Sequence, residues 1–336
     1  MIPISHQLDQ KAQEWLSTQE SFSQDLPWVF HDLSASDYRL LRDSKISVYS
    51  GKVRLMLSKE GDDTMQMLHT DRLSAFDCFV GYVPLKGAIL CGFSEYWFML
   101  LSSWNIPHHF LKRLNERNIL VKKSKPLGFE LVVRGYLAGS LLRDYLKGAR
   151  LLYGVTLPDG LKPHQKLPHP LITPTTKAAV FEHDLPITPK EIVSKGICTQ
   201  KQWDLSQDIA LTLYKKSHEY LLGKGFILAD TKYEVGLDID NNVHVIDEVH
   251  TPDSSRFWDL ASYETLCSQS LAPQMYDKEN VRQWLIAQGF SGQGSVPTIP
   301  RAELLKLAKV YCDTAARIDC PLNIEGLNTT RELFFA

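Results

Sequence analysis

Two neighbouring stretches decide the fold, Ile227–Asp238 (ILADTKYEVGLD) and Val243–Val249 (VHVIDEV). In the first stretch, charged residues alternate with other residues. A β-strand therefore places Asp230, Lys232 and Glu234 on one face of a sheet. The Asp and Asn residues between the two stretches suit a tight turn. Together the stretches predict an antiparallel hairpin with one charged face.

The expected register of this hairpin brings two acids together. If the turn is centred on Asp240 and Asn241, Glu234 lies opposite Asp247. Opposed carboxylates repel each other and raise each other's pKa unless a cation lies between them. Mg²⁺ is the natural cation, because it takes a few carboxylate oxygens and completes its shell with phosphate oxygens and water. Lys232 could then reach a phosphate or an acyl oxygen. The alternative is a solvated hairpin, although the apolar neighbours of Asp247 argue against it.

The rest of the chain predicts an α+β fold. Short β-prone runs predict an antiparallel sheet from residue 46, interrupted by a helix around Ser94–Trp104: KISVYS, VRLML, MQMLHT, FVGYVPL, NILVKK and ELVVRGY. Further helices are expected after Gly139, from the capping pair Thr199 and Gln202 to near Gly223, and over 280–287 and 301–317. The Pro-, Thr- and His-rich stretch 154–189 reads as a loop.

Three regions follow from this pattern. They are an N-terminal helical extension (1–45), a β-rich lobe (46–125), and an α+β lobe that includes the C-terminal helices (126–336).

Composition limits the classes of protein and partner. The 336 residues are 44% hydrophobic and 23% charged, which is typical of soluble globular proteins. The formal net charge of -2 gives no general attraction to nucleic acid or to an anionic membrane. The six cysteines contain no CxxC pair, and the N-terminus does not resemble a signal peptide. We therefore expect a cytoplasmic protein that binds neither nucleic acid nor a membrane. The sequence leaves the oligomeric state open.

Two motifs in the β-rich region carry polar groups that suit a ligand. In SGKVR, Gly51 can let the backbone approach a phosphate while Lys52 and Arg54 supply positive charge, although an ordinary hairpin with two surface cations is the alternative. In TDRLSAFD, Ser74 and Asp77 could bind a polar ligand, or the Arg and Asp residues could simply pair with each other.

Three later motifs are similarly open to two interpretations. In VRGYLAGS, Arg134 ends an apolar strand and Ser140 begins a helix, which suits either an anion site or simple capping. Lys177 and Asp184 lie in the Pro-rich stretch. TPDSSR contributes a further acid and guanidinium, those of Asp253 and Arg256.

Read in order, SGKVR, TDRLSAFD, VRGYLAGS, TPTTKA with EHD, ADTKYEVG and IDEVHTPDSSRFW resemble the phosphoribosylaminoimidazole-succinocarboxamide synthase (SAICAR synthetase) family over about Ile46–Tyr263. The resemblance implies an ATP-dependent ligase of purine biosynthesis, which joins L-aspartate to the carboxylate of carboxyaminoimidazole ribotide and releases ADP and phosphate through an acyl phosphate. It also implies two lobes with a nucleotide site between them, similar to protein kinases and ATP-grasp enzymes.

The same resemblance assigns roles to individual residues. It implies that ATP is bound by Gly51, Lys52 and Arg54, and Mg²⁺ by Glu234 and Asp247. It implies catalytic roles for Lys232, Asp230, Lys177 and Asp184. It implies substrate binding by Ser74, Asp77, Arg134, Ser140, Asp253 and Arg256. The sequence departs from the family pattern at Leu55, where relatives usually carry an acid, so any role of that acid does not transfer.

Two other functions fit parts of the pattern. A kinase-like small-molecule phosphotransferase also uses an Asp-x-Lys strand and a later metal-binding Asp, but it needs no aspartate. A regulatory protein would bind ATP and Mg²⁺ without turnover.

Overall fold

The computed structural model describes residues 41–42, 44–177 and 184–322, and it confirms an α+β fold with antiparallel sheets. The N-terminal extension predicted for residues 1–45 lies almost entirely outside the described residues. The described strands are β1 (Ile46–Ser50), β2 (Arg54–Lys59), β3 (Thr64–His69), β4 (Arg72–Ala75), β5 (Cys78–Tyr82), β6 (Phe110–Arg113), β7 (Asn118–Lys122), β8 (Lys125–Tyr136), β9 (Leu151–Leu152), β10 (Val155–Thr156), β11 (Lys166–Thr176), β12 (Phe226–Leu237), β13 (Val243–Ile246) and β14 (Ser255–Asp259). The described helices are α3 (Lys86–Ser103), α4 (Gly139–Leu146), α5 (Pro189–Ser194), α6 (Gln200–Gly223), α7 (Leu260–Ser268), α8 (Glu279–Ala287) and α9 (Arg301–Arg317).

The chain forms two compact units whose boundaries differ from the predicted ranges. Unit 1 comprises Met1–Tyr96, Phe110–Lys123 and Lys278–Ala336, and unit 2 comprises Trp97–His109 and Ser124–Asp277. The C-terminal helices therefore group with the β-rich region, although the sequence placed them in the range 126–336.

Contacts at the β4–β5 hairpin give the physical reason for this grouping. The rings of Phe76 and Phe290 lie 6.0 Å apart, and the Arg282 guanidinium lies 4.7 Å from the centre of the Phe76 ring.

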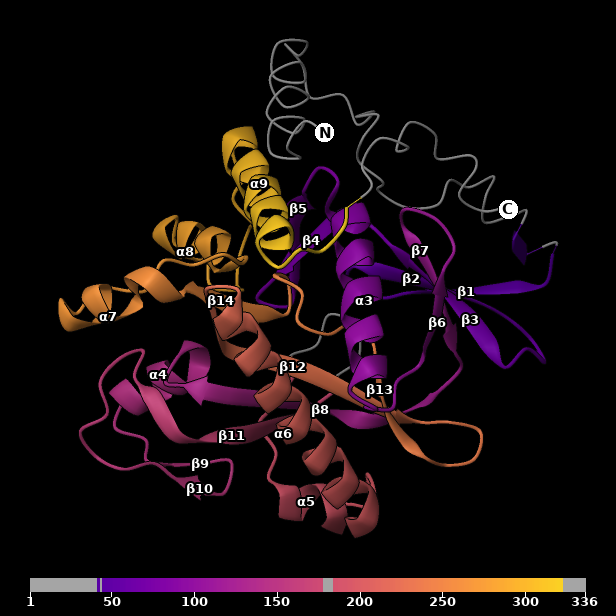
Figure 1. The fold of residues 1–336 in the computed structure, drawn as a ribbon, viewed down its shortest axis with the longest axis horizontal. Helices are drawn as coiled ribbons and strands as arrows, with labels where there is room; N and C mark the ends of the chain where they lie inside the picture. The colour runs from indigo at the N-terminus through magenta and orange to yellow at the C-terminus, as the bar shows by residue number, and fades with distance from the viewer. Residues whose placement is uncertain (1–40, 43, 178–183, 323–336) are drawn as a thin grey trace. The chain divides into compact units, whose positions relative to one another are not determined.

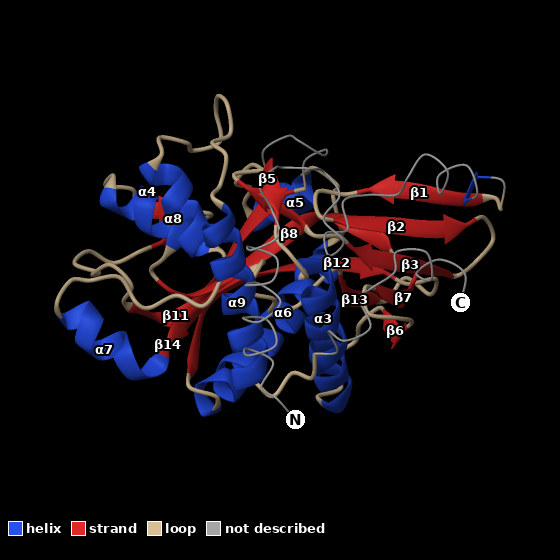
Figure 2. Cartoon of the chain, turned by 90° about the horizontal axis from the view of Figure 1, so that it is seen from above, coloured by secondary structure: helices blue, strands red, loops and turns tan. Residues whose placement is uncertain are grey.

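The main sheet of unit 1 has the order β1-β2-β3-β7-β6, and each pair of neighbours is antiparallel, as predicted (Figure 2). Leu55 is fully buried and packs with Leu57 and Leu68 in one apolar cluster. Because Leu55 fills the core, its departure from the family pattern has a packing explanation.

Helix α3 begins at Lys86, eight residues earlier than the sequence predicted. The backbone N–H of Gly87 donates to the carboxylate of Asp71 at 2.7 Å, which satisfies one of the open donors at the helix start. The apolar run after Gly87 can therefore stay helical from its first residue.

The main sheet of unit 2 has the order β11-β8-β12-β13, and β14 also pairs with β12. Helix α6 lies across one face of this sheet (Figure 1). It begins at the predicted capping box of Thr199 and Gln202. Tyr214 of α6 donates to the carbonyl of Leu228 at 2.7 Å, and Trp203 packs on Phe129 with ring centres 5.6 Å apart. One face of the sheet is therefore buried against α6 in the core.

The stretch 154–189 contains strand β11, so the prediction of a loop there was wrong. The residues Pro168, Pro170 and Pro174 hid the strand, because proline cannot donate to a sheet. β11 lies at the edge of the sheet and pairs only with β8 among the described strands. An edge position tolerates proline, since the outer side of the strand needs N–H donors only near its end, where Thr176 donates to the carbonyl of Leu185 at 2.9 Å.

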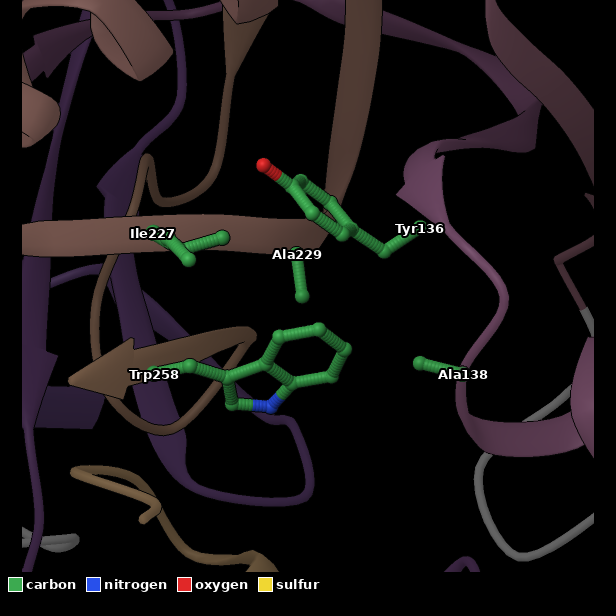
Figure 3. Packing of buried hydrophobic residues seen from close by; sticks show 5 residues of the cluster. All are labelled: Tyr136, Ala138, Ile227, Ala229 and Trp258. Atoms are coloured by element: carbon green, nitrogen blue, oxygen red, sulfur yellow. The ribbon is translucent and has the colours of Figure 1, made fainter. Parts of the chain in front are cut away.

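An aromatic cluster holds the ends of β8, β12 and β14 together (Figure 3). The rings of Tyr136 and Trp258 meet edge to face with centres 5.4 Å apart, and the small side chains of Ala138 and Ala229 leave room for them. Tyr136 lies two residues after Arg134, and Trp258 lies two residues after Arg256. The cluster therefore fixes the strand ends from which those arginines extend.

No helix in the part of the chain that the structure describes is long and apolar enough to cross a membrane.

Buried His250 makes the stability of unit 2 sensitive to acid. Its ring centre lies 4.7 Å from that of Trp97, and the Tyr233 hydroxyl lies 3.1 Å from Nε2. Burial lowers the pKa of His250 from 6.5 to about 3. Between these values the unfolded chain binds a proton that the folded chain does not. The stability that this group contributes is therefore complete above pH 6.5 and is lost as the pH falls toward 3.

We expect the His250→Phe variant to lose less stability than the natural chain when the pH is lowered from about 7 to about 5. The expected difference is about 2 kcal/mol. Thermal unfolding midpoints at the two pH values provide the measurement. Other buried histidines, such as His69, titrate in both proteins and cancel in the comparison. Equal losses in the two proteins would show that His250 is not the responsible group.

Candidate active site

The second face of the unit 2 sheet is polar. Strand β12 places Asp230 opposite Arg134 of β8 and opposite Arg256 of β14, and it places Glu234 opposite Glu130 of β8. Directly opposed residues in antiparallel strands share a face. The alternation seen in the sequence is therefore extended across three strands, and charges from all three meet on one surface.

The predicted register of the β12–β13 hairpin was wrong by one residue. Glu234 lies opposite Ile246, not Asp247. The connection is the loop Asp238–Asn242 rather than a turn centred between Asp240 and Asn241. The backbone N–H of Asp238 donates to the carbonyl of Asn242, and the carboxylate of Asp238 accepts the N–H groups of Asp240 and Asn242. These local hydrogen bonds favour a wider loop, which the turn residues alone did not reveal.

Asp247 nevertheless acts on the same cations as Glu234. A one-residue slip would send its side chain to the other face of a regular strand, but β13 ends at Ile246 and Asp247 has a left-handed φ of 65°. Burial lowers the pKa of Lys177 and of Lys232, yet both values are raised, because the charges of Glu234, of Asp247 and, for Lys232, also of Glu130 outweigh that effect. The two acids therefore share an electrostatic environment without being cross-strand partners.

Two lysines and two acids form the first charge cluster of the polar face. Nζ of Lys232 donates to Glu130 at 2.6 Å and to Glu234 at 3.0 Å, and Lys177 donates to the second oxygen of Glu234. Burial raises the pKa of Glu234, but Lys232 and Lys177 outweigh it and lower the value to about 2. Burial dominates for Glu130, whose pKa is raised despite Lys232. Near neutral pH this cluster holds a firmly ionised Glu234 beside two ammonium groups.

Two arginines and one acid form the second cluster. Nη1 of Arg256 donates to both oxygens of Asp230, at 3.0 and 2.7 Å, and Nη1 of Arg134 donates to Asp230 at 3.2 Å. Arg134 also donates to the hydroxyls of Ser140, at 3.0 Å, and Thr173, at 2.8 Å. Two guanidinium groups meet at one carboxylate, and guanidinium groups held in this way suit an anionic ligand.

The sequence analysis missed Glu130 and Thr173. Each makes a direct contact with a candidate residue, Glu130 with Lys232 and Thr173 with Arg134. The available signal for Glu130 was a lone acid in the otherwise apolar run FELVV. Thr173 opens the motif TPTTKA, but nothing in the motif distinguished it from the other threonines.

Unit 1 brings two of the predicted motifs together. Nζ of Lys52, in the loop between β1 and β2, lies 2.7 Å from the carboxylate of Asp77, which follows β4. Asp77 and Phe76 both have left-handed φ values, 60° and 55°. The carboxylate of Asp71, in the same motif, accepts two hydrogen bonds from Arg117, of 2.7 and 3.0 Å.

The remaining candidates are placed as follows. In unit 1, Arg54 is buried at the start of β2, Gly51 N–H donates to the Arg54 carbonyl at 2.8 Å, and Ser74 lies in β4. In unit 2, Asp253 is buried in the loop before β14. Asp184 is half-buried, and its charge contributes to the raised pKa of Glu130 after burial and the nearer charges.

Comparison with known proteins gives consistent matches. A sequence model described as SAICAR synthetase matches residues 47–298. A putative phosphoribosylaminoimidazole-succinocarboxamide synthase 2 of Agrobacterium fabrum is 41% identical over 274 residues, which cover 80% of this chain and 86% of that protein. The phosphoribosylaminoimidazole-succinocarboxamide synthase of Legionella pneumophila (strain Lens) is 40% identical over 268 residues, which cover 78% of this chain and 84% of that protein.

Solved structures agree with these relatives. The SAICAR-synthase from Saccharomyces cerevisiae complexed with SAICAR has a TM-score of 0.71 and 30% identity, covering 84% of this chain and 98% of that chain. A type-2 SAICAR synthetase in complex with ADP has a TM-score of 0.64 and 26% identity, covering 82% of this chain and 99% of that chain.

These matches define a carbon–nitrogen ligase and decide against the kinase-like phosphotransferase that the sequence had left open. The chain belongs to the SAICAR synthetase family. Its activity is that of a phosphoribosylaminoimidazole-succinocarboxamide synthase of de novo purine biosynthesis.

The newly found Glu130 can be tested through the pH dependence of turnover. We expect Glu130→Gln to lower kcat about tenfold or more, because Lys232 loses the charge of a carboxylate to which it donates at 2.6 Å. Since burial raises the pKa of Glu130, the natural enzyme should also lose activity as the pH falls through that raised value. The variant should lack this acidic decline.

The measurement is kcat from about pH 5 to about pH 8 for both proteins. Thr175→Val is the matched control, because it removes a hydroxyl that donates to Glu130 at 3.3 Å but leaves the charge in place. An unchanged acidic limb in Glu130→Gln would assign that limb to another group.

Proposed function

We propose that the polar face of the unit 2 sheet is where ATP phosphorylates the carboxylate of carboxyaminoimidazole ribotide and where L-aspartate then displaces the phosphate. The observation that carries this proposal is the pairing of two clusters on one face. One contains Lys232 and Lys177 beside two buried acids, and the other contains Arg134 and Arg256 on Asp230. Complexes of two related structures with SAICAR and with ADP support the choice of ligands.

The reaction has two steps. A carboxylate oxygen of the ribotide attacks the γ-phosphorus of ATP, the bond from that phosphorus to the bridging oxygen breaks, and ADP leaves with the electron pair. The amine of aspartate then attacks the carbonyl carbon, the carbon–oxygen bond to phosphate breaks, and phosphate leaves. The amine nitrogen releases its surplus protons to solvent. No protein nucleophile is needed, so the residues orient reactants and offset charge.

The lysines serve as fixed positive charges. Their pKa values are raised by Glu234, Asp247 and, for Lys232, also Glu130, after burial has acted in the opposite direction. Both ammonium groups therefore stay protonated at neutral pH and cannot accept the amine proton. Their role is to stabilise the negative charge that gathers on the transferring phosphoryl group and on the acyl oxygen.

The arginine cluster binds the anionic part of the ribotide. Asp230 orients Arg134 and Arg256, while Ser140 and Thr173 fix the second and third donors of Arg134. Guanidinium groups held in this way are suited to a phosphate, which they recognise through paired N–H donors.

Other candidate residues take supporting roles in the proposal. Gly51, Lys52 and Arg54 of unit 1 bind the phosphates of ATP, and Asp77 orients Lys52 through their 2.7 Å ion pair. Ser74 and Asp253 contribute to substrate binding. Asp184 adds negative charge near Glu130, as its effect on the pKa of Glu130 indicates.

Mg²⁺ fits the carboxylates present. Glu234 stays ionised, since the lysines lower its pKa to about 2, and Asp247 acts on the same two lysines. Among the described residues there is no group of three or more His, Cys, Asp and Glu side chains that could hold a metal. Glu234 and Asp247 would therefore hold the ion together with phosphate oxygens and water, as is usual for Mg²⁺. When bound, Mg²⁺ offsets the charge of the nucleotide phosphates.

Substitutions of these two acids should separate metal binding from folding. We expect Glu234→Gln and Asp247→Asn each to abolish measurable turnover and to weaken Mg²⁺ binding by about tenfold or more. Binding of Mg²⁺ in the presence of ADP, followed by calorimetry, provides a readout other than activity. Asp240→Asn is the control, because Asp240 lies exposed at the tip of the same hairpin. Normal turnover in both site variants at limiting Mg²⁺ would remove these acids from the mechanism.

The acyl phosphate can be tested by following oxygen atoms. If the ribotide carboxylate is labelled with ¹⁸O, each turnover should deliver one labelled oxygen to inorganic phosphate, because the carboxylate oxygen that attacks phosphorus leaves with it. Mass spectrometry of the phosphate is the measurement. A parallel reaction in labelled water with unlabelled ribotide should give unlabelled phosphate. The opposite labelling in the two reactions would mean that water, not the ribotide, attacks ATP.

A further inference from the structure

Gly139 and Arg256 make a contact that only glycine permits. Gly139 is the first residue of α4 and has a left-handed φ of 56°. A Cβ atom built on it would lie 2.7 Å from Nη1 of Arg256, 2.9 Å from Cζ and 2.9 Å from Nη2. Because three atoms of the planar guanidinium are nearly equidistant from one point, the face of the guanidinium lies against the Gly139 backbone.

The same guanidinium is held at its edge by an acid. Nη1 of Arg256 donates to both oxygens of Asp230, at 3.0 and 2.7 Å. These hydrogen bonds hold Nη1 at the carboxylate. The backbone of Gly139 lies against one face of the guanidinium, so it limits how far the plane can tilt toward α4.

The next residue along the chain performs the matching task for the other arginine. The hydroxyl of Ser140 accepts a hydrogen bond from Nη2 of Arg134 at 3.0 Å. The two residues at the start of α4 therefore orient two arginines that come from different strands, β8 and β14. One residue does so by having no side chain, and the other does so with its hydroxyl.

We propose that Gly139 is a positioning residue, which forms a flat seat for the guanidinium of Arg256 and thereby sets the affinity for the ribotide. This inference rests on the proposed function, in which Arg256 and Arg134 bind an anionic group of that substrate. A phosphate or carboxylate is recognised through N–H groups that lie in the guanidinium plane. A side chain at position 139 must push that plane away, since real Cβ atoms essentially never show contacts below 3.0 Å.

The test begins with Gly139→Ala. We expect the KM for carboxyaminoimidazole ribotide to rise about tenfold or more, while the KM values for ATP and aspartate change less than about twofold. Gly139→Asn is the second variant, because asparagine tolerates a left-handed backbone better than alanine does but still carries a Cβ atom. It should raise the same KM, and it carries the test if the alanine variant does not fold.

Gly196→Ala is the matched control. Gly196 also lies in unit 2 and has a left-handed φ of 69°, but a Cβ atom on it would meet nothing within 4 Å. This variant pays the backbone cost of a left-handed alanine without a collision. It should lower the thermal midpoint about as much as Gly139→Ala and leave all three KM values unchanged. Equal KM changes in the two variants would overturn the proposal.

A double-mutant cycle with Arg256→Lys identifies the partner. Lysine has no planar group to meet the added Cβ, so Gly139→Ala should raise the ribotide KM less than about twofold in the Arg256→Lys background. If Gly139→Ala raises the ribotide KM as much in the Arg256→Lys background as in the natural chain, Gly139 does not act through Arg256. The proposed role of Arg256 itself would then still stand. If Arg256→Lys alone leaves the ribotide KM unchanged, the role of Arg256 in the proposed function fails, and the seat fails with it.

Discussion

The polar face of unit 2 depends on one constraint, that a buried charge must have a partner. Asp230 and Glu234 are almost fully buried, and each accepts hydrogen bonds from two cationic side chains. Removing one member of such a buried pair leaves the other uncompensated, at a cost of roughly 3–5 kcal/mol. The charged residues of this face therefore hold one another in place before any substrate arrives. A pre-organised set of charges of this kind is what an electrostatic mechanism requires.

The two faces of the unit 2 sheet have different roles, one in packing and the other in the proposed chemistry. One face packs on α6 through residues such as Phe129 and Tyr214, and the other face presents the charges. Because opposed residues share a face, strand pairing alone brings Glu130, Arg134 and Arg256 next to the alternating charges of β12. The aromatic cluster of Tyr136 and Trp258 then holds the strand ends that carry the two arginines. Strand β12 thus carries Asp230, Lys232 and Glu234, whereas Lys177 and Asp184 lie outside the strands.

Several site residues lie where regular structure ends. Asp77 follows β4, Asp247 follows β13, and Gly139 is the first residue of α4. All three have left-handed backbones. For a residue with a side chain this conformation costs on the order of 1 kcal/mol or more. At Asp77 the ion pair with Lys52 and the packing of the preceding Phe76 on Arg282 and Phe290 hold the turn. At Asp247 the left-handed residue ends the strand alternation, and its charge acts on Lys177 and Lys232.

The sequence by itself determined the α+β class, the family resemblance and the alternating charges of β12, because side-chain alternation in a strand and helix capping are local properties. It did not determine the hairpin register, strand β11 or the place of the C-terminal helices. Register follows from hydrogen bonds within the Asp238–Asn242 loop, and a proline-rich segment is a strand only where an edge is available to it. Only the tertiary structure revealed the contacts of Glu130, Thr173 and Gly139. Each of these residues contacts a side chain that is distant in the sequence.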